Sequence, residues 1–405
     1  MMEEDTYWTY KEYFIFKPDF NKPLKTYTKL IKKHTKLIFS NHNDFRTNKN
    51  IITSDINLNS RSKVNYSTHG FRGSCFNLPL VISQLNQLTK ITLGYEFNKP
   101  LTNSLDKLIL LNELNFGTKF NQPLSNSLDQ LLNLEVLTFG GNFTQSLTDS
   151  LNKLTKLKKL FFGRSVKYFD ILSFHISFDK NINLEQLIVG DMHILQPNSL
   201  KQLINLKQLY FGKFFNEQLD DSLNNLTLLN KLCFGLDFNV QLGNSLDQLV
   251  NLEILIFGQR FNKPLNNSLN KLTLLKKLTF GREFNNSLSD SLLHLINLIH
   301  LTLGYDFNQE LNIPSNIKIL TLNCNNQNLI DNLPNSIEQL NFDYEFDLPL
   351  DNLPNSIKSI SFTSEHTIYN KSLNNLPRLL NKLTLSKTYR NKISNLPPNC
   401  EIVYL

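Results

Sequence analysis

The segment LNELNFGTKFNQPLSNSLDQL, residues 111–131, recurs along the 405-residue chain with the same spacing of Leu, Phe and Ser. It returns as LEVLTFGGNFTQSLTDSLNKL at 134–154 and as LEILIFGQRFNKPLNNSLNKL at 252–272. From Gly94 to Gly304 the glycine of each copy lies 23 residues after the previous one, except for one interval of 27 and one of 22. Self-similarity at a fixed period of this length is typical of a solenoid built from stacked repeats.

The repeat divides the chain into three parts. Residues 76–310 carry the regular 23-residue repeats of FNxPL type, with an irregular unit at 164–190 that has four extra residues. Residues 1–75 match weakly, and we predict divergent N-terminal repeats or a cap, with 40–75 as eroded repeats or a looped insertion. Residues 311–405 contain shorter repeats that open with Leu-Pro or Ile-Pro, and we expect them to end in a C-terminal cap.

The pattern L-x-x-L-x-F predicts a short strand, because apolar and polar residues alternate with the period of a β-strand. In the copy quoted second, Leu137 and Phe139 are expected to face the core, and Val136 and Thr138 to face outward. The glycine that follows, Gly140 in this copy and Gly117 and Gly258 in others, suits a backbone that turns sharply or adopts a positive φ.

The second half of each copy contains Asn/Asp-Ser-Leu. Serine is a favoured helix N-cap, and Gln130 and Gln248 stand three residues after their serines, as in a capping box. Leucines three residues apart then suit one or two turns of α- or 3₁₀-helix. We therefore predict an α/β, leucine-rich-repeat-like solenoid with parallel strands on the concave face and short helical or 3₁₀ turns on the convex face.

The recurring signature FNxPL resembles the FNIP repeat, named for Phe-Asn-Ile-Pro, a relative of leucine-rich repeats found in social amoebae and in giant viruses that infect amoebae. The resemblance covers residues 76–405 strongly and 16–75 weakly, and the absence of alanine beside abundant Asn, Lys, Ile and Phe agrees with an AT-rich genome of either source. It implies structural roles for the phenylalanines and asparagines of the signature. We expect the asparagines to form a ladder of hydrogen bonds to backbone in the turn; the residues are Phe97, Asn98, Phe120, Asn121, Phe261 and Asn262.

Many FNIP proteins are reported with an N-terminal F-box, which docks to cullin-type ubiquitin ligases. One alternative function is therefore a substrate-recognition adaptor for such a ligase. Here the repeat pattern begins near Phe16, and KTYTKLIKKHTKLIFSNHNDF within 25–75 lacks the Leu-Pro start of an F-box. Only a degenerate F-box within 25–75 would support the adaptor.

The motifs of common enzymes and metal sites are absent from the sequence. The eight histidines form no HExxH or zinc spacing, and no GxxxxGK[ST], GxGxxG or GxSxG occurs. Cys400, the last of four widely separated cysteines, lies in the final repeat with no domain behind it. We predict a protein without catalytic residues, metal or cofactor.

Composition limits the remaining classes. The chain is 40% hydrophobic, has no apolar run of the roughly 18 residues needed to cross a bilayer, and begins with an acidic, aromatic segment unlike a signal peptide. Separated cysteines without CxxC fit reduced thiols. We expect a monomer inside the cell, in the cytoplasm (of the host if the chain is viral), and without a membrane partner.

The net charge of +7 raises the alternative of nucleic-acid binding through a basic surface. Lysine recurs on the predicted strands, for example at Lys90, Lys159, Lys231 and Lys277, but Glu, Gln and Ile interrupt the series. A solvated face is the preferred interpretation of these lysines.

The outward strand positions point to a partner protein instead. Small polar residues there flank five consecutive apolar ones, and Ile254 lies beside them; the set is Phe161, Ile188, Tyr210, Cys233, Ile254 and Ile256. A stripe of this length would cover a few hundred Å², the scale of a binding patch. We predict a protein-protein interaction scaffold that binds an unidentified partner here. The alternative is that the irregular unit at 164–190 folds over the stripe and buries it.

Overall fold

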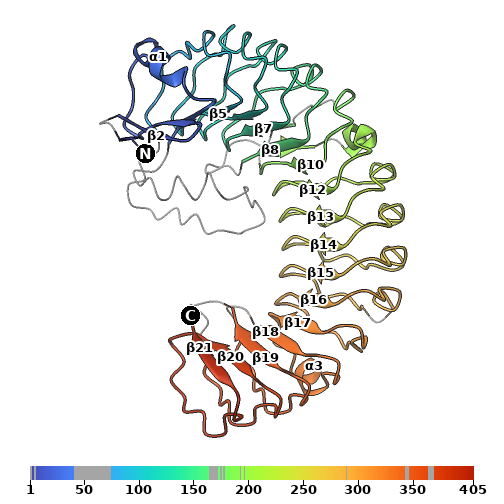
Figure 1. Ribbon diagram of the computed structural model, residues 1–405. Helices are drawn as coiled ribbons and strands as arrows, with labels where there is room; N and C mark the ends of the chain where they lie inside the picture. Colours follow the sequence, from blue (N-terminus) through green and yellow to red (C-terminus); the bar gives the residue numbers. More distant parts are fainter. Residues whose placement is uncertain are drawn as a thin grey trace. The chain divides into compact units, whose positions relative to one another are not determined.

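The computed structural model describes residues 2–3, 6–40, 74–163, 172–173, 176, 178–191, 193–195, 197–288, 290–342, 346–363 and 369–405. The chain divides into two compact units, residues 1–203 and residues 204–405 (Figure 1). Each unit is a stack of short strands joined by turns.

In the unit of residues 1–203, the strands from β3 onward run parallel, each paired in register with the one before it. They are β3 (Tyr13–Phe16), β4 (Lys36–Phe39), β5 (Lys90–Thr92), β6 (Glu113–Asn115), β7 (Val136–Phe139), β8 (Lys159–Phe162) and β10 (Gln186–Ile188). Two antiparallel strands, β1 (Met2–Glu3) and β2 (Tyr7–Tyr10), precede them, and β2 pairs with β3. A separate parallel pair joins β9 (Leu172–Ser173) to β11 (His193–Ile194).

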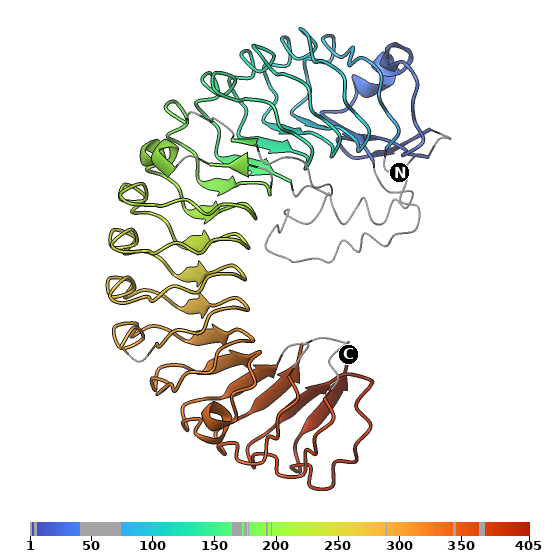
Figure 2. The ribbon, with the colours of Figure 1, turned by 180° about the vertical axis from the view of Figure 1, so that it is seen from behind.

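In the unit of residues 204–405, all ten described strands pair parallel in sequence order, and both ribbon views show them along one side with the turns on the other (Figures 1 and 2). They are β12 (Gln208–Tyr210), β13 (Lys231–Cys233), β14 (Ile254–Ile256), β15 (Lys277–Thr279), β16 (His300–Leu303), β17 (Ile319–Leu322), β18 (Gln339–Phe342), β19 (Ser359–Phe362), β20 (Lys382–Leu385) and β21 (Glu401–Tyr404). This parallel solenoid confirms the predicted fold.

The strands alternate as predicted. In β7, Leu137 and Phe139 are buried, whereas Val136 and Thr138 are half-exposed. The outward strand residues of each unit form what we call its strand face, and the opposite side, made by the turns, is its turn face.

Phenylalanine fills the core in two stacked columns. One column comes from strand ends, where the Phe234 and Phe257 rings lie 5.5 Å apart, and the other from the FNxPL signature, where Phe238 and Phe261 lie 5.9 Å apart. Within one turn the two columns touch, since Phe257 and Phe261 stack at 4.1 Å. Because no single turn can enclose its own phenyl rings, stacking neighbours supplies the burial.

The repeated glycine is explained by close contact between backbones. It does not adopt the positive φ that the sequence allowed for it. A Cβ on Gly117, Gly140 or Gly258 would collide with the backbone carbonyl of the glycine one turn earlier. The left-handed residue comes later in the turn, directly after the FNxPL signature, as at Gly243 (φ +53°) and Asn266 (φ +46°).

The turn face contains few helices among the described residues: η1 (Leu24–Tyr27), α1 (Thr28–Ile31), η2 (Pro197–Gln202) and α3 (Gln327–Asp331). Elsewhere single i→i+3 hydrogen bonds, such as Leu131 N–H to Leu128 O (3.0 Å), give 3₁₀-like turns. The segments containing Gln130 and Gln248 are turns too, so the predicted capping boxes have no helix to cap. The serines bond between turns instead, as when Ser268 Oγ donates to Gly243 O (2.9 Å).

The stack continues in register across a long sequence interval near the N-terminus. Strand β4 pairs directly with β5, with Lys36 opposite Lys90, although 33 residues, 41–73, separate Ser40 from Ser74. The phenyl rings of Phe39 and Phe76 stack at 4.3 Å, as those of neighbouring columns do elsewhere. Residues 41–73 lie outside the described residues. They include most of 25–75, where a degenerate F-box was considered, and most of 40–75, predicted as eroded repeats or a looped insertion.

Candidate partner-binding surface

The six residues predicted to bind a partner belong to two units. In the unit of residues 1–203, Phe161 on β8 and Ile188 on β10 are directly opposite in the parallel register. Phe161 is only 6% exposed, whereas Ile188 is half-buried. Phe161 thus lies in the outward row with Thr138 and Ile188, yet it is buried and offers a partner little surface. Much of the irregular unit at 164–190, including residues 164–171, lies outside the described residues. The alternative that this unit folds over the stripe therefore falls on residues that the structure does not describe.

In the unit of residues 204–405 the structure brings the other four residues together on three adjacent strands. Tyr210 pairs with Cys233, and Cys233 with Ile256, in one row across β12, β13 and β14. Ile254 lies two residues before Ile256 on the same face of β14, because side chains alternate along a strand. All four side chains are half-buried, so an incoming group can contact them.

A second row of the same strand face contains two lysines. Gln208, Lys231, Ile254 and Lys277 are paired in register from β12 to β15. The Lys231 ammonium lies 5.2 Å from the centre of the Tyr210 ring, and the Tyr210 hydroxyl donates a weak hydrogen bond to Gln208 Oε1 (3.4 Å). Burial raises the pKa of Tyr210, so the phenol stays neutral. We did not assign Lys231 and Lys277 to the site from the sequence, although their position beside Ile254 is readable from the repeat register.

Toward β17 the strand face becomes polar. His300 Nε2 lies 3.0 Å from Thr321 Oγ1 and 3.4 Å from Thr302 Oγ1. Burial, and to a lesser extent the positive charge of Lys277, lowers the pKa of His300 to about 4. His300 is thus neutral at pH 7, and it contributes hydrogen bonding to this face without charge.

The signature asparagines form the ladder that the sequence predicts. The backbone N–H of Asn98 donates to Asn77 Oδ1 (2.9 Å), and that of Asn121 to Asn98 Oδ1 (2.9 Å). In the second unit Asn262 N–H donates to Asn239 Oδ1 (2.9 Å). The accompanying Phe97, Phe120 and Phe261 are fully buried in the phenyl columns, so these residues hold one turn to the next.

A row of exposed aliphatic side chains on the turn face was missed from the sequence. In the second unit each of five successive turns presents one, and all are between 43% and 67% exposed: Ile204, Leu228, Val250, Leu274 and Ile296. Alternate turns carry Asn at the next position, and its side chain bonds the preceding turn, as Asn251 Nδ2 does to Thr227 O (2.8 Å). The alternation of Thr-Leu with Ile-Asn or Val-Asn would have revealed this row.

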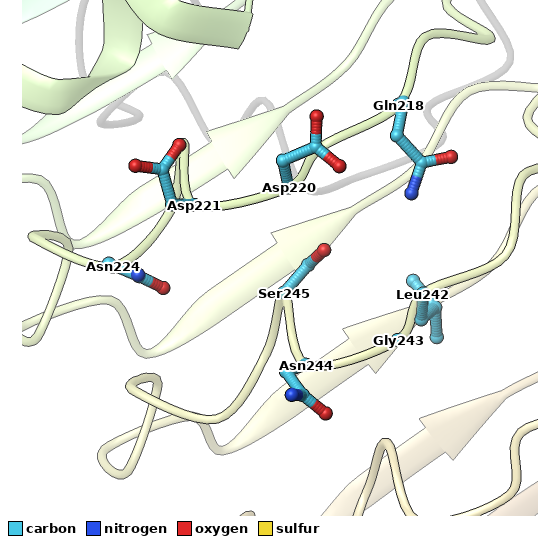
Figure 3. A pocket seen from close by; sticks show the side chains of 8 residues that line it. All are labelled: Gln218, Asp220, Asp221, Asn224, Leu242, Gly243, Asn244 and Ser245. Carbon is cyan, nitrogen blue, oxygen red and sulfur yellow. The ribbon is translucent and has the colours of Figure 1, made fainter.

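The turn face of the second unit also has a shallow depression of about 250 Å³ (Figure 3). Figure 3 shows Gln218, Asp220, Asp221 and Asn224 on one turn, and Leu242, Gly243, Asn244 and Ser245 on the next. Two carboxylates do not make a metal site: in the described part of the chain no group of three or more His, Cys, Asp or Glu could hold an ion. His294 and His300 share a repeat but lie on different faces: His294 is exposed on the turn face, and His300 lies on the strand face.

Two further properties concern the described residues alone. None of their helices is long and apolar enough to span a bilayer. Their four cysteines, Cys75, Cys233, Cys324 and Cys400, are free thiols.

Comparison with known proteins agrees with this geometry. The chain is similar to the crystal structure of CroV588, a circular leucine-rich-repeat protein of a giant virus. The similarity covers 99% of this chain and 70% of CroV588, with a TM-score of 0.50 and 21% sequence identity. A leucine-rich-repeat protein of Leptospira interrogans is similar over 80% of this chain and 92% of its own, with a TM-score of 0.51 and 19% identity. No curated protein matches in sequence.

The family comparison falls on the C-terminal part of the chain. The FNIP repeat matches residues 326–364, which include α3, β18 and β19 and the variant signature FDLPL at 346–350. The chain thus carries an FNIP repeat and folds as a leucine-rich-repeat-like solenoid.

Proposed function

We propose that this protein is a non-enzymatic scaffold that binds a partner protein on the strand face of residues 204–405. The observation that carries the proposal is the half-buried apolar group formed by Tyr210, Cys233, Ile254 and Ile256 on β12 to β14. Strands in a stacked solenoid are rigid, so these side chains are ordered before a partner arrives and binding costs little conformational entropy. A tyrosine with two isoleucines supplies the aromatic and aliphatic contacts that anchor many protein interfaces.

The test compares two matched substitutions in the whole chain. The Ile254→Glu/Ile256→Glu variant places two carboxylates in the apolar group, and Val250→Glu/Leu274→Glu makes the same chemical change on the turn face. Partners captured from an amoeba lysate by the wild-type chain should be lost from the strand-face variant and kept by the turn-face variant. Loss from the turn-face variant alone would assign binding to the exposed aliphatic row and overturn the proposal, as would retention by both.

A milder pair of changes separates binding from folding. The chain has Gln at the equivalent of Ile254 on β12 and Thr at the equivalent of Ile256 on β15, so Ile254→Gln/Ile256→Thr uses side chains this fold accepts. Circular dichroism and thermal unfolding of this variant should match the wild type, while partner capture should fall.

A further inference from the structure

The strand face from β12 to β20 has a one-sided charge. From β12 to β20 the strands contain no Asp or Glu, while Lys231, Lys277 and Lys382 are among their residues. The unit of residues 1–203 differs, because Lys90 of β5 pairs there with Glu113 of β6 at 2.8 Å. From β12 to β20 the strands thus supply cations to their face without supplying carboxylates, and the first carboxylate in this row is Glu401 of β21, opposite Lys382.

Two of these lysines bracket the apolar group described above. The register places Lys231, Ile254 and Lys277 side by side on β13, β14 and β15. Neighbouring strands are about 4.8 Å apart, so the two lysine backbones are separated by about 10 Å with an isoleucine midway. Cys233, Ile256 and Thr279 form a parallel row two residues further along the strands. The first row therefore presents a cation, an aliphatic side chain and a second cation, and the row beside it, Cys233, Ile256 and Thr279, is only weakly polar.

The flanking residues of the same strand face add no further charge. Across β16 the neutral His300 adds none at pH 7, and on β12 the residues are Gln208 and Tyr210. A ligand matched to this array needs negative charge at two points and an apolar group between them. A nucleic acid would supply the charges, but it offers no aliphatic side chain for Ile254 and Ile256, and Tyr210 is the only Phe, Trp or Tyr on β12 to β16 for base stacking.

We propose, building on the function above, that the partner segment held here is acidic and apolar, with two carboxylates about 10 Å apart on either side of an aliphatic side chain. The carboxylates meet the ammonium groups of Lys231 and Lys277, and the aliphatic group packs on Ile254 and Ile256. Opposite charges at the rim fix the position of the segment, and apolar contact at the centre supplies most of the affinity.

The experiment measures binding of labelled peptides to the full chain by fluorescence polarisation. The probe has three Glu-Ser-Leu-Glu repeats; one control replaces every Glu by Gln, another every Leu by Ser, and a single-stranded oligonucleotide is the third ligand. We expect binding of the Glu-Leu probe to exceed that of both control peptides, and to weaken about tenfold in Lys231→Gln/Lys277→Gln, because two partly exposed ion pairs are lost. Gln occupies the same strand position on β12 and β18, so this variant should fold.

A matched control removes the same charge elsewhere in the unit. Lys276→Gln/Lys358→Gln breaks ion pairs with Glu253 and Glu338, at 2.9 Å and 2.7 Å, that lie just before strands, and it should leave peptide binding unchanged. Equal binding of the Gln probe, or equal weakening by both lysine pairs, would overturn the acidic-segment inference while leaving the scaffold proposal standing. Binding of the oligonucleotide alone, lost in Lys231→Gln/Lys277→Gln, would assign the array to nucleic acid. If Ile254→Gln/Ile256→Thr leaves binding of the Glu-Leu probe intact, the strand-face site itself fails.

Discussion

At the residue scale, two glycines of successive repeats, Gly258 and Gly243, serve opposite needs. Gly258 has an ordinary φ but no room, since a Cβ would meet the carbonyl of Gly235. Gly243 has room on every side but a φ of +53°. The first is a glycine because of its neighbour, and the second because of its own backbone.

This difference predicts opposite outcomes for two substitutions. Gly258→Ala should lower the free energy of unfolding by about 1–3 kcal/mol, because the backbone of two turns must separate to admit the methyl group. Gly243→Asn should change it by less than about 0.5 kcal/mol, since Asn266 adopts the same left-handed conformation one turn later. Urea unfolding followed by circular dichroism measures both, and equal destabilisation would show that close approach is not the cause at Gly258.

The half-buried His300 predicts a pH dependence of stability. Its pKa is lowered to about 4, mainly by burial and then by Lys277, so between pH 6.5 and pH 4 the unfolded chain binds a proton that the folded chain does not. Stability from this group is therefore complete above pH 6.5 and is lost as the pH falls toward 4. After allowance for solvent screening the loss is on the order of 1 kcal/mol, and His300→Gln should abolish this part of the pH profile. An NMR titration giving His300 an ordinary pKa would contradict the expectation.

At the scale of the element, a turn is joined to the next by a column of rings and by a ladder of amides. The rings exclude water, and the ladder satisfies backbone N–H groups that leave the strand register, such as that of Asn285, which donates to Asn262 Oδ1 at 3.0 Å. Both act between turns, and the rings also stack within one turn, as Phe257 and Phe261 do. The sequence was sufficient to predict strands, ladder and core here, because each recurs in every copy.

The ladder predicts a contrast between two changes at Asn262. Asn262→Ala removes the acceptor and should cost about 1 kcal/mol, with faster hydrogen exchange at the Asn285 amide. Asn262→Asp keeps an acceptor oxygen and should retain the protection, since Asp347 fills this role for Asn370 N–H at 2.9 Å. Equal exchange in the two variants would argue against the ladder.

The two phenyl columns should differ in tolerance. The strand-end column already admits aliphatic residues, with Leu303 and Leu322 buried at that position, so Phe257→Leu should cost about 1 kcal/mol. The signature column is interrupted by Asn326 in the turn of α3, but where its phenylalanine is replaced nearer the C-terminus the ring is kept, by Tyr369 and Tyr389, which stack at 6.1 Å. Phe261→Leu should therefore destabilise more, by about 2 kcal/mol, and thermal unfolding of both variants compares them.

At the scale of the whole molecule, repetition decides what could be predicted. Fold class, strand positions and the ladder follow from residues that recur in register. The conformation of the serine turns did not, because Asn/Asp-Ser-Leu fits an N-cap as well as the turn-to-turn bond that Ser268 makes to Gly243. Within the candidate site, Tyr210, Cys233, Ile254 and Ile256 lie together as the register requires, whereas the burial of Phe161 depends on packing that no repeat pattern contains.

The direct pairing of β4 with β5 predicts that residues 41–73 can be removed. Joining Ser40 to Ser74 leaves three residues between Phe39 and Phe76, the spacing that separates Phe139 from Phe143. The thermal midpoint should stay within a few degrees of the wild type, since closing a shorter loop has a small entropic effect. Removing residues 41–74 instead shortens the spacing by one and deletes the acceptor for Glu96 N–H, so this control should melt earlier.

The alternation on the turn face bears on how such a chain changes length over generations. Ile204, Val250 and Ile296 lie 46 residues apart, with Leu228 and Leu274 on the turns between them. A recombination event that adds or drops 46 codons keeps every junction of an existing kind, whereas one of 23 codons joins two turns of like type. The gene can therefore grow or shrink in pairs of turns with no new contact to be tested by selection.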